Sequence, residues 1–195
     1  MKILKKIMIV IVILIAIPLV IALFVKKDYA VEREVVISKS KTEVFDYVKY
    51  LKNQDNYSKW ASMDPDMKKT FTGTDGTVGF ISAWESDNKE VGKGEQEIIK
   101  ITEGEKIEFE LRFLEPFQAT EPAFMTTESV SENETKVVWG FRGHMNYPMN
   151  LMFLFMDFEE IIGGDLNTGL EELKVILEKM EPEIEVVEIE EGSSE

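Results

Sequence analysis

The sequence contains no cysteine and only one histidine, His144. A chain without cysteine can form neither a disulfide nor a thiolate metal site, and one histidine has no second histidine with which to share a metal ion. The absence of cysteine fits an oxidising and a reducing compartment equally well, so it does not locate the protein. The Gly-x-Ser-x-Gly motif of serine hydrolases is also missing. We therefore expect no metal ion and no cofactor.

Positive charge is scarce, with 22 lysine and arginine residues against 37 aspartate and glutamate residues and a net charge of −15. Five of the lysines precede the first acidic residue, Asp28, and without them the remainder carries −20. Nucleic-acid binding requires a basic face that neutralises phosphates. The charge distribution therefore predicts that this protein does not bind nucleic acid.

Only one stretch is long and apolar enough to cross a bilayer. Residues 7–25 are uninterrupted apolar sequence except for Pro18, and as a helix they approach the hydrocarbon thickness of about 30 Å. A cleaved signal peptide is the alternative, but its apolar region is normally shorter, and here the apolar run continues past the weak cleavage site at residues 20–22. We expect an uncleaved single-pass anchor.

The lysines that flank this stretch bear on its orientation. Three lie before it, at positions 2, 5 and 6, and two follow it, at positions 26 and 27. Since positive residues tend to remain on the cytoplasmic side, this small excess favours a domain outside the cytoplasm, with a cytoplasmic domain as the alternative.

From Tyr29 onward the hydrophobic pattern changes to period two, which predicts a strand. Ser40 and Glu43 then form a capping box, which predicts a helix that ends near Asn53, and Tyr57 and Trp60 give a short second helix an aromatic face. Further segments with strand patterning are bounded by turn residues. These six strands are expected at residues 67–72, 78–85, 91–102, 107–114, 119–130 and 136–145.

Residues 148–180 have apolar side chains at three- and four-residue steps, which predicts a long amphipathic helix. Gly163, Gly164 and Gly169 interrupt it, each at a cost of about 1 kcal/mol relative to alanine. We expect a kink, a close approach to the sheet, or room for a ligand. The predicted fold is therefore α+β, with a curved antiparallel sheet of about seven strands around a long C-terminal helix, plus an N-terminal transmembrane helix.

Three regions are expected along the chain. Residues 1–27 form the anchor with its basic flanks, residues 28–180 form the folded domain, and residues 181–195 form an acidic tail. Within the domain, several stretches in order resemble those of the polyketide cyclase/dehydrase-related group of the START-like (SRPBCC) superfamily. The stretches are residues 31–37 followed by 44–46, Trp60 with 64–65, 79–84 followed by 91–94, 113–117, 135–139, and 162–170 with Leu173.

This resemblance covers residues 29–178 and implies the helix-grip fold that the birch pollen allergen also has. It further implies a pocket between the long helix and the sheet for a small apolar or amphipathic molecule. It does not imply one chemistry, because the superfamily includes carriers, hormone-binding proteins and cyclases.

The residues expected to line this pocket share an inward position on a strand or helix. They are Phe80, Trp84, Phe109, Leu111, Phe113, Trp139, Phe141, Met145, Met152, Met156, Ile162 and Leu166. For any single aromatic among them, ordinary core packing is the simpler interpretation, since apolar strand faces are buried with or without a ligand. Methionines at positions 145, 149, 152 and 156 suit either a pliable pocket mouth or a packed seam.

Candidate catalytic residues are few. His144 titrates near neutral pH and Arg142 lies two residues before it, but a structural role is the simpler interpretation of both. Glu95 and Glu97 are expected to pair with Arg112 on the outer face of the sheet.

The sequence thus predicts a membrane-anchored module that binds a small hydrophobic or amphipathic ligand, lipid-like or isoprenoid-like. An enzyme of the cyclase, dehydratase or hydrolase kind is the alternative. The expected partners are that ligand and, through residues 7–25, a membrane; the oligomeric state is left open.

Overall fold

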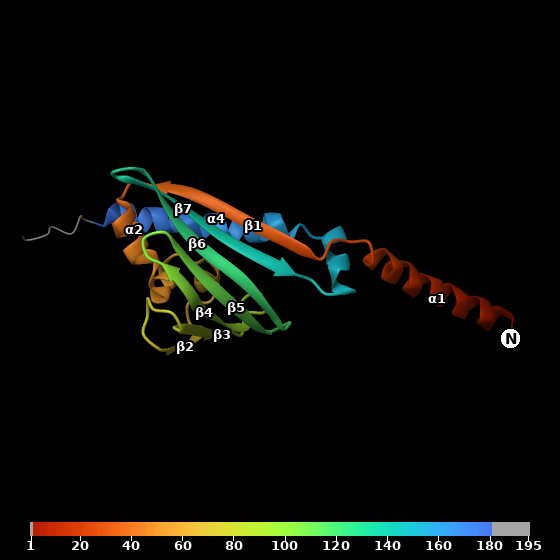
Figure 1. Ribbon diagram of the computed structural model, residues 1–195. Coiled ribbons are helices and arrows are strands. Elements are labelled where there is room, and N and C mark those ends of the chain that lie inside the picture. The colour runs from red at the N-terminus through yellow and green to blue at the C-terminus, as the bar shows by residue number, and fades with distance from the viewer. Residues whose placement is uncertain (1, 181–195) are drawn as a thin grey trace, which may run out of the picture.

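The computed structural model describes residues 2–180 (Figure 1). The expected acidic tail at residues 181–195 lies outside the described residues. An N-terminal helix precedes a seven-stranded sheet with short helices in its first crossover, and a long helix ends the described chain. The elements are α1 (Lys2–Ala22), β1 (Asp28–Ile37), α2 (Lys41–Val48), η1 (Leu51–Asn56), α3 (Lys59–Met63), β2 (Lys68–Thr72), β3 (Ile81–Glu85), β4 (Lys93–Thr102), β5 (Lys106–Glu115), β6 (Ala119–Ser131), β7 (Glu134–His144), η2 (Met149–Leu154) and α4 (Phe158–Lys179).

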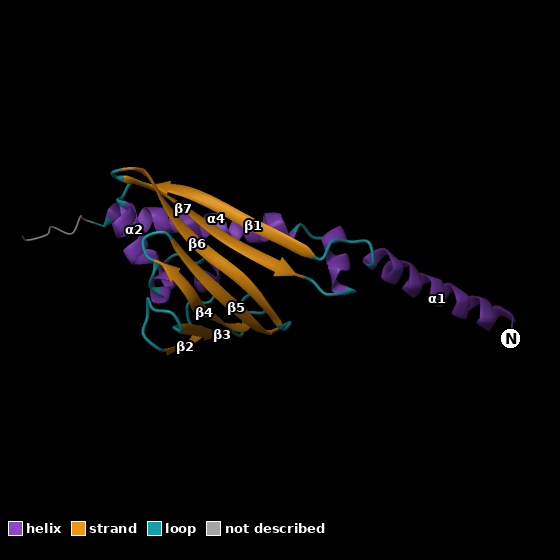
Figure 2. Ribbon diagram, viewed as in Figure 1, coloured by secondary structure: helices purple, strands orange, loops and turns teal. Residues whose placement is uncertain are grey.

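All strand pairs are antiparallel, in the order β1-β7-β6-β5-β4-β3-β2. The last strand, β7, pairs with the first strand, β1, which forms one edge of the sheet. β2 forms the opposite edge. The predicted α+β class, with a curved antiparallel sheet, a C-terminal helix and an N-terminal apolar helix, is confirmed (Figure 2).

The two faces of the sheet differ in polarity, as strand alternation predicts. On β5, Ile107 and Phe109 are buried on the inner face. On the outer face, Arg112 binds three carboxylates, those of Glu95 at 2.6 Å, Glu97 at 2.8 Å and Glu110 at 2.6 Å. This confirms the predicted outer-face ion pairs.

The capping box at the start of α2 is also confirmed. The Ser40 hydroxyl accepts from the Glu43 backbone N–H, and the Glu43 carboxylate accepts from the Ser40 backbone N–H at 3.1 Å. These bonds satisfy donors that a helix N-terminus leaves without intrahelical partners. The helix is shorter than expected, because it ends at Val48 and η1 takes over from Leu51.

The expected helix at residues 148–180 is divided in the structure, which corrects the prediction. Met149–Leu154 form the separate turn η2, and α4 begins only at Phe158. The division has a local cause at Asp157. Its carboxylate accepts a hydrogen bond from the Glu160 backbone N–H at 3.1 Å, and this N-cap starts a new helix. Phe155, one of the apolar residues whose spacing predicted a helix with a buried side, is 85% exposed.

The buried side of α4 packs chiefly against β1. Its inward side chains are Leu166, Leu170, Leu173 and Leu177, all nearly inaccessible. Gly169 faces Trp139 on β7, and a Cβ at position 169 would lie 2.8 Å from the Trp139 ring. The close approach of helix and sheet predicted from the glycines is therefore confirmed at Gly169, whereas Gly164 faces open space.

The N-terminal helix α1 projects away from the domain, and almost all its side chains are exposed (Figure 1). Its last turn is the exception, because Ala22 is fully buried against η2. The Asn150 side-chain amide, itself fully buried, donates to the carbonyl oxygens of Ala22 at 2.7 Å and Val25 at 3.0 Å. Asn150 thus satisfies carbonyls at the end of α1 that have no partner within the helix.

Candidate ligand-binding site

The residues predicted to line a pocket fall into two groups by burial. The first group is enclosed in the hydrophobic core, at 9% exposure or less. Its members are Phe80, Phe109, Trp139, Phe141 and Leu166.

Trp139 illustrates how closely this part of the inner face is packed. Its ring meets Tyr57 edge-on at 5.8 Å between ring centroids and Trp60 at 6.3 Å, while Gly169 of α4 lies over it. The Tyr57 hydroxyl donates to the Met125 sulfur at 3.6 Å, and burial raises the pKa of Tyr57. Here the helix and sheet fit together without a gap for a ligand.

The second group is only partly buried, although it lies on the same inner face. It consists of Trp84 on β3, Leu111 and Phe113 on β5, and Ile162 in the first half of α4. Trp84 and Phe113 both lie opposite Gly94 of β4 in the strand register. These four side chains are therefore partly exposed to solvent at the margin of the enclosed core.

Trp84 is held firmly in this position. Its indole N–H donates to the Val91 carbonyl at 3.3 Å. The ring lies against Gly94, where a Cβ would come within 2.6 Å of Trp84 Cζ2. A fixed, partly exposed indole offers a large apolar contact at little cost in conformational entropy.

Two buried polar side chains, which the sequence analysis missed, lie among these apolar residues. Gln96 and Glu121 are each 8% exposed on the inner faces of β4 and β6, and both lie opposite Leu111. A Glu121 carboxylate oxygen accepts from the His144 backbone N–H at 2.9 Å. Burial raises the pKa of Glu121 and the hydrogen bond from His144 opposes that rise. The sequence did contain a signal for Glu121: it lies two residues before Ala123 on the same strand, so alternation places its carboxylate on the inner face.

Aromatic rings connect this part of the inner face with the end of the sheet next to α1. Trp84 contacts Phe113 with 6.3 Å between ring centroids, and Phe113 contacts Phe141 at 6.4 Å. Phe141 in turn contacts Tyr29 at 6.0 Å, and Tyr29 contacts Phe153 at 5.5 Å. The series ends at an open hollow of about 340 Å³ between β1 and η2.

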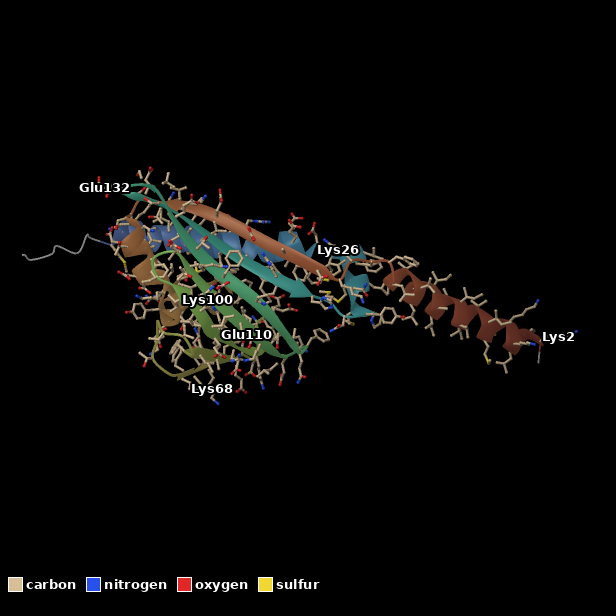
Figure 3. All side chains as sticks on the ribbon, viewed as in Figure 1. Lys2, Lys26, Lys68, Lys100, Glu110 and Glu132 are labelled. Atoms are coloured by element: carbon tan, nitrogen blue, oxygen red, sulfur yellow. The ribbon has the colours of Figure 1, made fainter. Side chains whose placement is uncertain are left out.

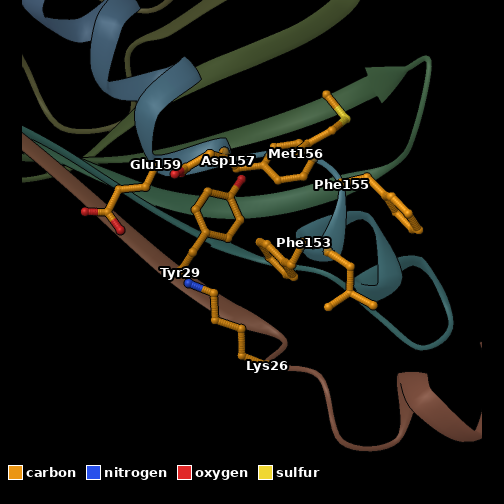
Figure 4. Close-up of a pocket in the computed structure, with 9 residues that line it drawn as sticks. Lys26, Tyr29, Phe153, Phe155, Met156, Asp157 and Glu159 are labelled. Atoms are coloured by element: carbon orange, nitrogen blue, oxygen red, sulfur yellow. The ribbon is translucent and has the colours of Figure 1, made fainter.

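Figure 4 shows this hollow, with Tyr29 and Phe153 facing one another and Phe155 turned outward. Burial raises the pKa of Tyr29 to about 12, and the nearby Glu121 carboxylate adds to the rise. The hollow is lined by Lys26, Tyr29, Phe153, Leu154, Phe155, Met156, Asp157, Phe158 and Glu159. Tyr29, Phe153 and Phe158 were absent from the predicted lining. For Phe153 and Phe158 the reason is that the division of residues 148–180 into two elements is not visible in the hydrophobic pattern.

The four methionines expected at a pocket mouth differ in their positions. Met145 follows β7, and its backbone N–H donates to the Lys27 carbonyl at 2.8 Å. Met152 is partly buried in η2, whereas Met149 and Met156 are exposed. Of these four residues, Met156 lines the hollow itself.

His144 and Arg142 lie on the outer face of β7, because they alternate with the inward residues Phe141 and Gly143. The His144 ring Nδ1 is 2.6 Å from an Asp28 carboxylate oxygen, and both side chains are solvent-exposed. Neither residue reaches the inner face. Within residues 2–180, no group of three or more histidine or acidic side chains is arranged to hold a metal ion.

Neither a protein-family model nor a curated protein sequence matches the chain. Solved structures do. Norcoclaurine synthase from Thalictrum flavum matches with a TM-score of 0.59 at 9% identity, over 79% of this chain and 96% of that one. A protein from Mesorhizobium loti matches at 0.56 and 12% identity, over 79% and 100%. The Aha1 dimer from Colwellia psychrerythraea matches at 0.53 and 13% identity, over 77% and 97%.

The chain has the helix-grip fold. The match extends over nearly the whole length of each neighbour. At these identities the similarity concerns the fold alone. In this helix-grip domain α4 packs chiefly against β1, and the inner-face residues Trp84, Leu111 and Phe113 on β3 and β5 stay partly exposed. The resemblance to the polyketide cyclase/dehydrase-related group of the START-like superfamily stays a prediction.

Proposed function

We propose that this protein is a membrane-anchored helix-grip module that binds a small apolar or amphipathic molecule, of the size and character of a lipid or isoprenoid, against the inner face of the sheet. The supporting observation is the partial exposure of Trp84, Leu111 and Phe113, which lie on the same face as the enclosed core. Burial of apolar surface contributes about 25 cal/mol of favourable free energy for each Å² removed from water. An apolar ligand that covers these side chains therefore forms a more stable complex.

The polar residues beside these side chains restrict the proposed ligand. Gln96 and Glu121 can hydrogen-bond one polar group of a bound molecule, while the surrounding contacts are apolar. An anionic group is disfavoured, because it would approach the Glu121 carboxylate in a domain of strongly negative net charge. We therefore propose a neutral or cationic amphiphile.

We propose that α1 remains attached as the membrane anchor. Asn150 binds the carbonyls of Ala22 and Val25, so the end of α1 forms part of the folded domain. Cleavage after Ala22 would remove Ala22 from its buried position against η2. The excess of lysines before α1 favours a domain on the side of the membrane away from the cytoplasm.

A binding role is proposed in preference to catalysis because the two candidate catalytic side chains do not face the accessible inner residues. Arg142 and His144 are exposed on the opposite face of the sheet. A general acid or base must come within hydrogen-bonding distance of the atom it serves.

The experiment is a titration of the protein with neutral, cationic and anionic amphiphiles, monitored by tryptophan emission and checked by mass spectrometry of the retained ligand. Trp84→Ala is expected to weaken binding by about 1 to 3 kcal/mol through lost apolar contact. His144→Ala is the matched control and should leave affinity unchanged. Emission that stays flat across the series, or a loss of binding in His144→Ala but not in Trp84→Ala, would contradict the proposal.

A further inference from the structure

We propose that the end of the domain next to α1 docks into the surface of the bilayer in which α1 is embedded, so that the hollow beside Tyr29 opens at the lipid surface. This inference rests on the proposed anchoring role of α1. The docking surface consists of five exposed apolar side chains, which we call the apolar rim: Phe24, Leu114, Phe117, Leu154 and Phe155.

The members of the apolar rim are unusually accessible for their size. Phe24 and Phe155 are each 85% exposed, and Phe117 is 68% exposed. Leu114 and Leu154 are both more than half exposed. Exposed apolar side chains that gather at one end of a domain mark an interaction surface, whereas single ones are common on any protein.

The strand register places the apolar rim at one end of the sheet. β1 begins at Asp28, which pairs with His144 at the end of β7. Because the strands are antiparallel, β6 begins and β5 ends at this same end, where Phe113 pairs with Ala119. The connection that contains Phe117 and the turn η2 therefore both lie at the end from which α1 emerges (Figure 1).

The anchor holds this end of the domain close to the membrane. Only five residues separate α1 from β1, and the contact of Asn150 with the Ala22 and Val25 carbonyls joins η2 to the last turn of α1. Figure 3 shows Lys26 at this junction and Glu132 at the opposite end of the domain. If α1 spans the bilayer, η2 is held at the level of the lipid headgroups.

The charges near the apolar rim indicate how it would meet the lipid. Lys26 and Lys27 follow α1, and the Lys26 ammonium lies 5.5 Å from the centre of the Phe153 ring. Basic and aromatic side chains are enriched where membrane proteins cross the interface. Asp157 and Glu159 lie just beyond Phe155 on the chain and oppose both deep insertion and attraction to anionic headgroups. The docking is therefore apolar and shallow, and it does not require an anionic lipid.

Docking in this position has a consequence for the ligand. The hollow lined by Tyr29, Phe153 and Phe155 would open at the level of the lipid headgroups, and the aromatic contacts from Tyr29 to Trp84 would connect it with the partly exposed inner-face residues. An amphiphile could then enter the domain from the bilayer without passing through water.

The absence of cysteine allows a direct test with single nitroxide labels on the full chain in phosphatidylcholine vesicles. Labels are placed through Phe155→Cys and Phe117→Cys in the apolar rim, through Leu14→Cys within α1, and through Val130→Cys at the far end of the sheet. Val130 is a matched control because it is also apolar and more than half exposed. Accessibility is measured to oxygen, which concentrates in lipid, and to a water-soluble nickel chelate.

We expect the oxygen-to-nickel accessibility ratio at positions 155 and 117 to exceed that at position 130 several-fold and to lie below that at position 14. Asn150→Ala should lower the ratio at position 155, while Asn146→Ala, at an exposed side chain in the same segment, should not.

Each other result overturns the inference in a distinguishable way. If position 14 is lipid-embedded but position 155 resembles position 130, the anchor stands and the docking is refuted. If neither reagent reaches position 155, a protein surface covers the apolar rim instead of lipid. If position 14 is itself accessible to nickel, the proposed anchoring fails together with the inference. An unchanged ratio in Asn150→Ala would refute the role of Asn150.

Discussion

Single residues decide how closely helix and sheet approach in this domain. Gly169 is required where α4 crosses Trp139, because any Cβ there would meet the indole ring and would lie 3.2 Å from the Tyr57 carbonyl oxygen. At Gly163 the nearest group is the Arg33 guanidinium on β1, the end of a flexible side chain that can move aside. The cost of glycine within a helix is thus offset by contacts that no larger residue permits.

Replacement of Gly169 by leucine should therefore destabilise the protein. The added side chain overpacks the contact with Trp139, and we expect a loss of about 1 to 3 kcal/mol in the free energy of unfolding, measured by thermal denaturation in detergent. Gly164→Ala is the control five residues earlier in the same helix, where the space is open. That substitution should stabilise the helix by up to about 1 kcal/mol. Equal effects at the two positions would refute the packing argument.

At the scale of elements, the caps determine where helices begin. Ser40 starts α2 and Asp157 starts α4, and in both cases a side-chain oxygen satisfies a backbone donor in the first turn. The capping box of α2 also depends on charge. The hydrogen bond from Ser40, with further contributions from the Ser40 backbone and from Lys39, lowers the pKa of Glu43.

Ser40→Ala should cost about 0.5 to 2 kcal/mol of stability at neutral pH. A glutamate whose pKa is lowered by folding stabilises the native state above its unfolded pKa, and that contribution is lost as the pH falls through the folded pKa. The difference between the wild type and Ser40→Ala should therefore narrow in acid, below the ordinary value of 4.5. Denaturant unfolding as a function of pH measures this, with the exposed first-turn substitution Thr42→Ala as the control. A difference that widens in acid would contradict the assignment.

At the scale of the whole molecule, the chain combines an exposed apolar helix with an acidic domain. α1 is long and apolar enough to cross a membrane, by length and composition, and it is the only such helix in residues 2–180. The domain has its own core, built from β1, β4 to β7, α2 and α4, with further residues from the connecting segments. The apolar side chains of α1 are therefore suited to lipid, and the domain with its buried core and acidic surface is suited to water.

Removal of residues 1–25 should convert a membrane-bound protein into a soluble, folded one. The apolar rim would still bring a few side chains to lipid, but binding of this kind is reversible and should be lost on washing. The measurement is sedimentation with washed membranes, together with far-ultraviolet circular dichroism of the soluble fraction. A truncated protein that stays with the membranes after washing would contradict the prediction.

Much of this architecture followed from the sequence, because local physical chemistry specifies it. Period-two alternation located all seven strands, the Ser40 and Glu43 pair located α2, and the outward carboxylates around Arg112 were recognised from the same alternation. The family resemblance added the helix-grip arrangement, which local patterns do not specify.

The sequence did not determine which inward residues are packed and which are accessible. Trp84 and Trp139 have the same alternation signal, but Trp139 is enclosed by Tyr57, Trp60 and Gly169, while Trp84 stays partly exposed beside Gly94. Burial depends on what the rest of the chain brings to that face, and α4 begins ten residues later than its apolar pattern predicted because Asp157 caps it. The contact of Asn150 with the end of α1 joins residues 128 apart in sequence, so only the tertiary structure could reveal it.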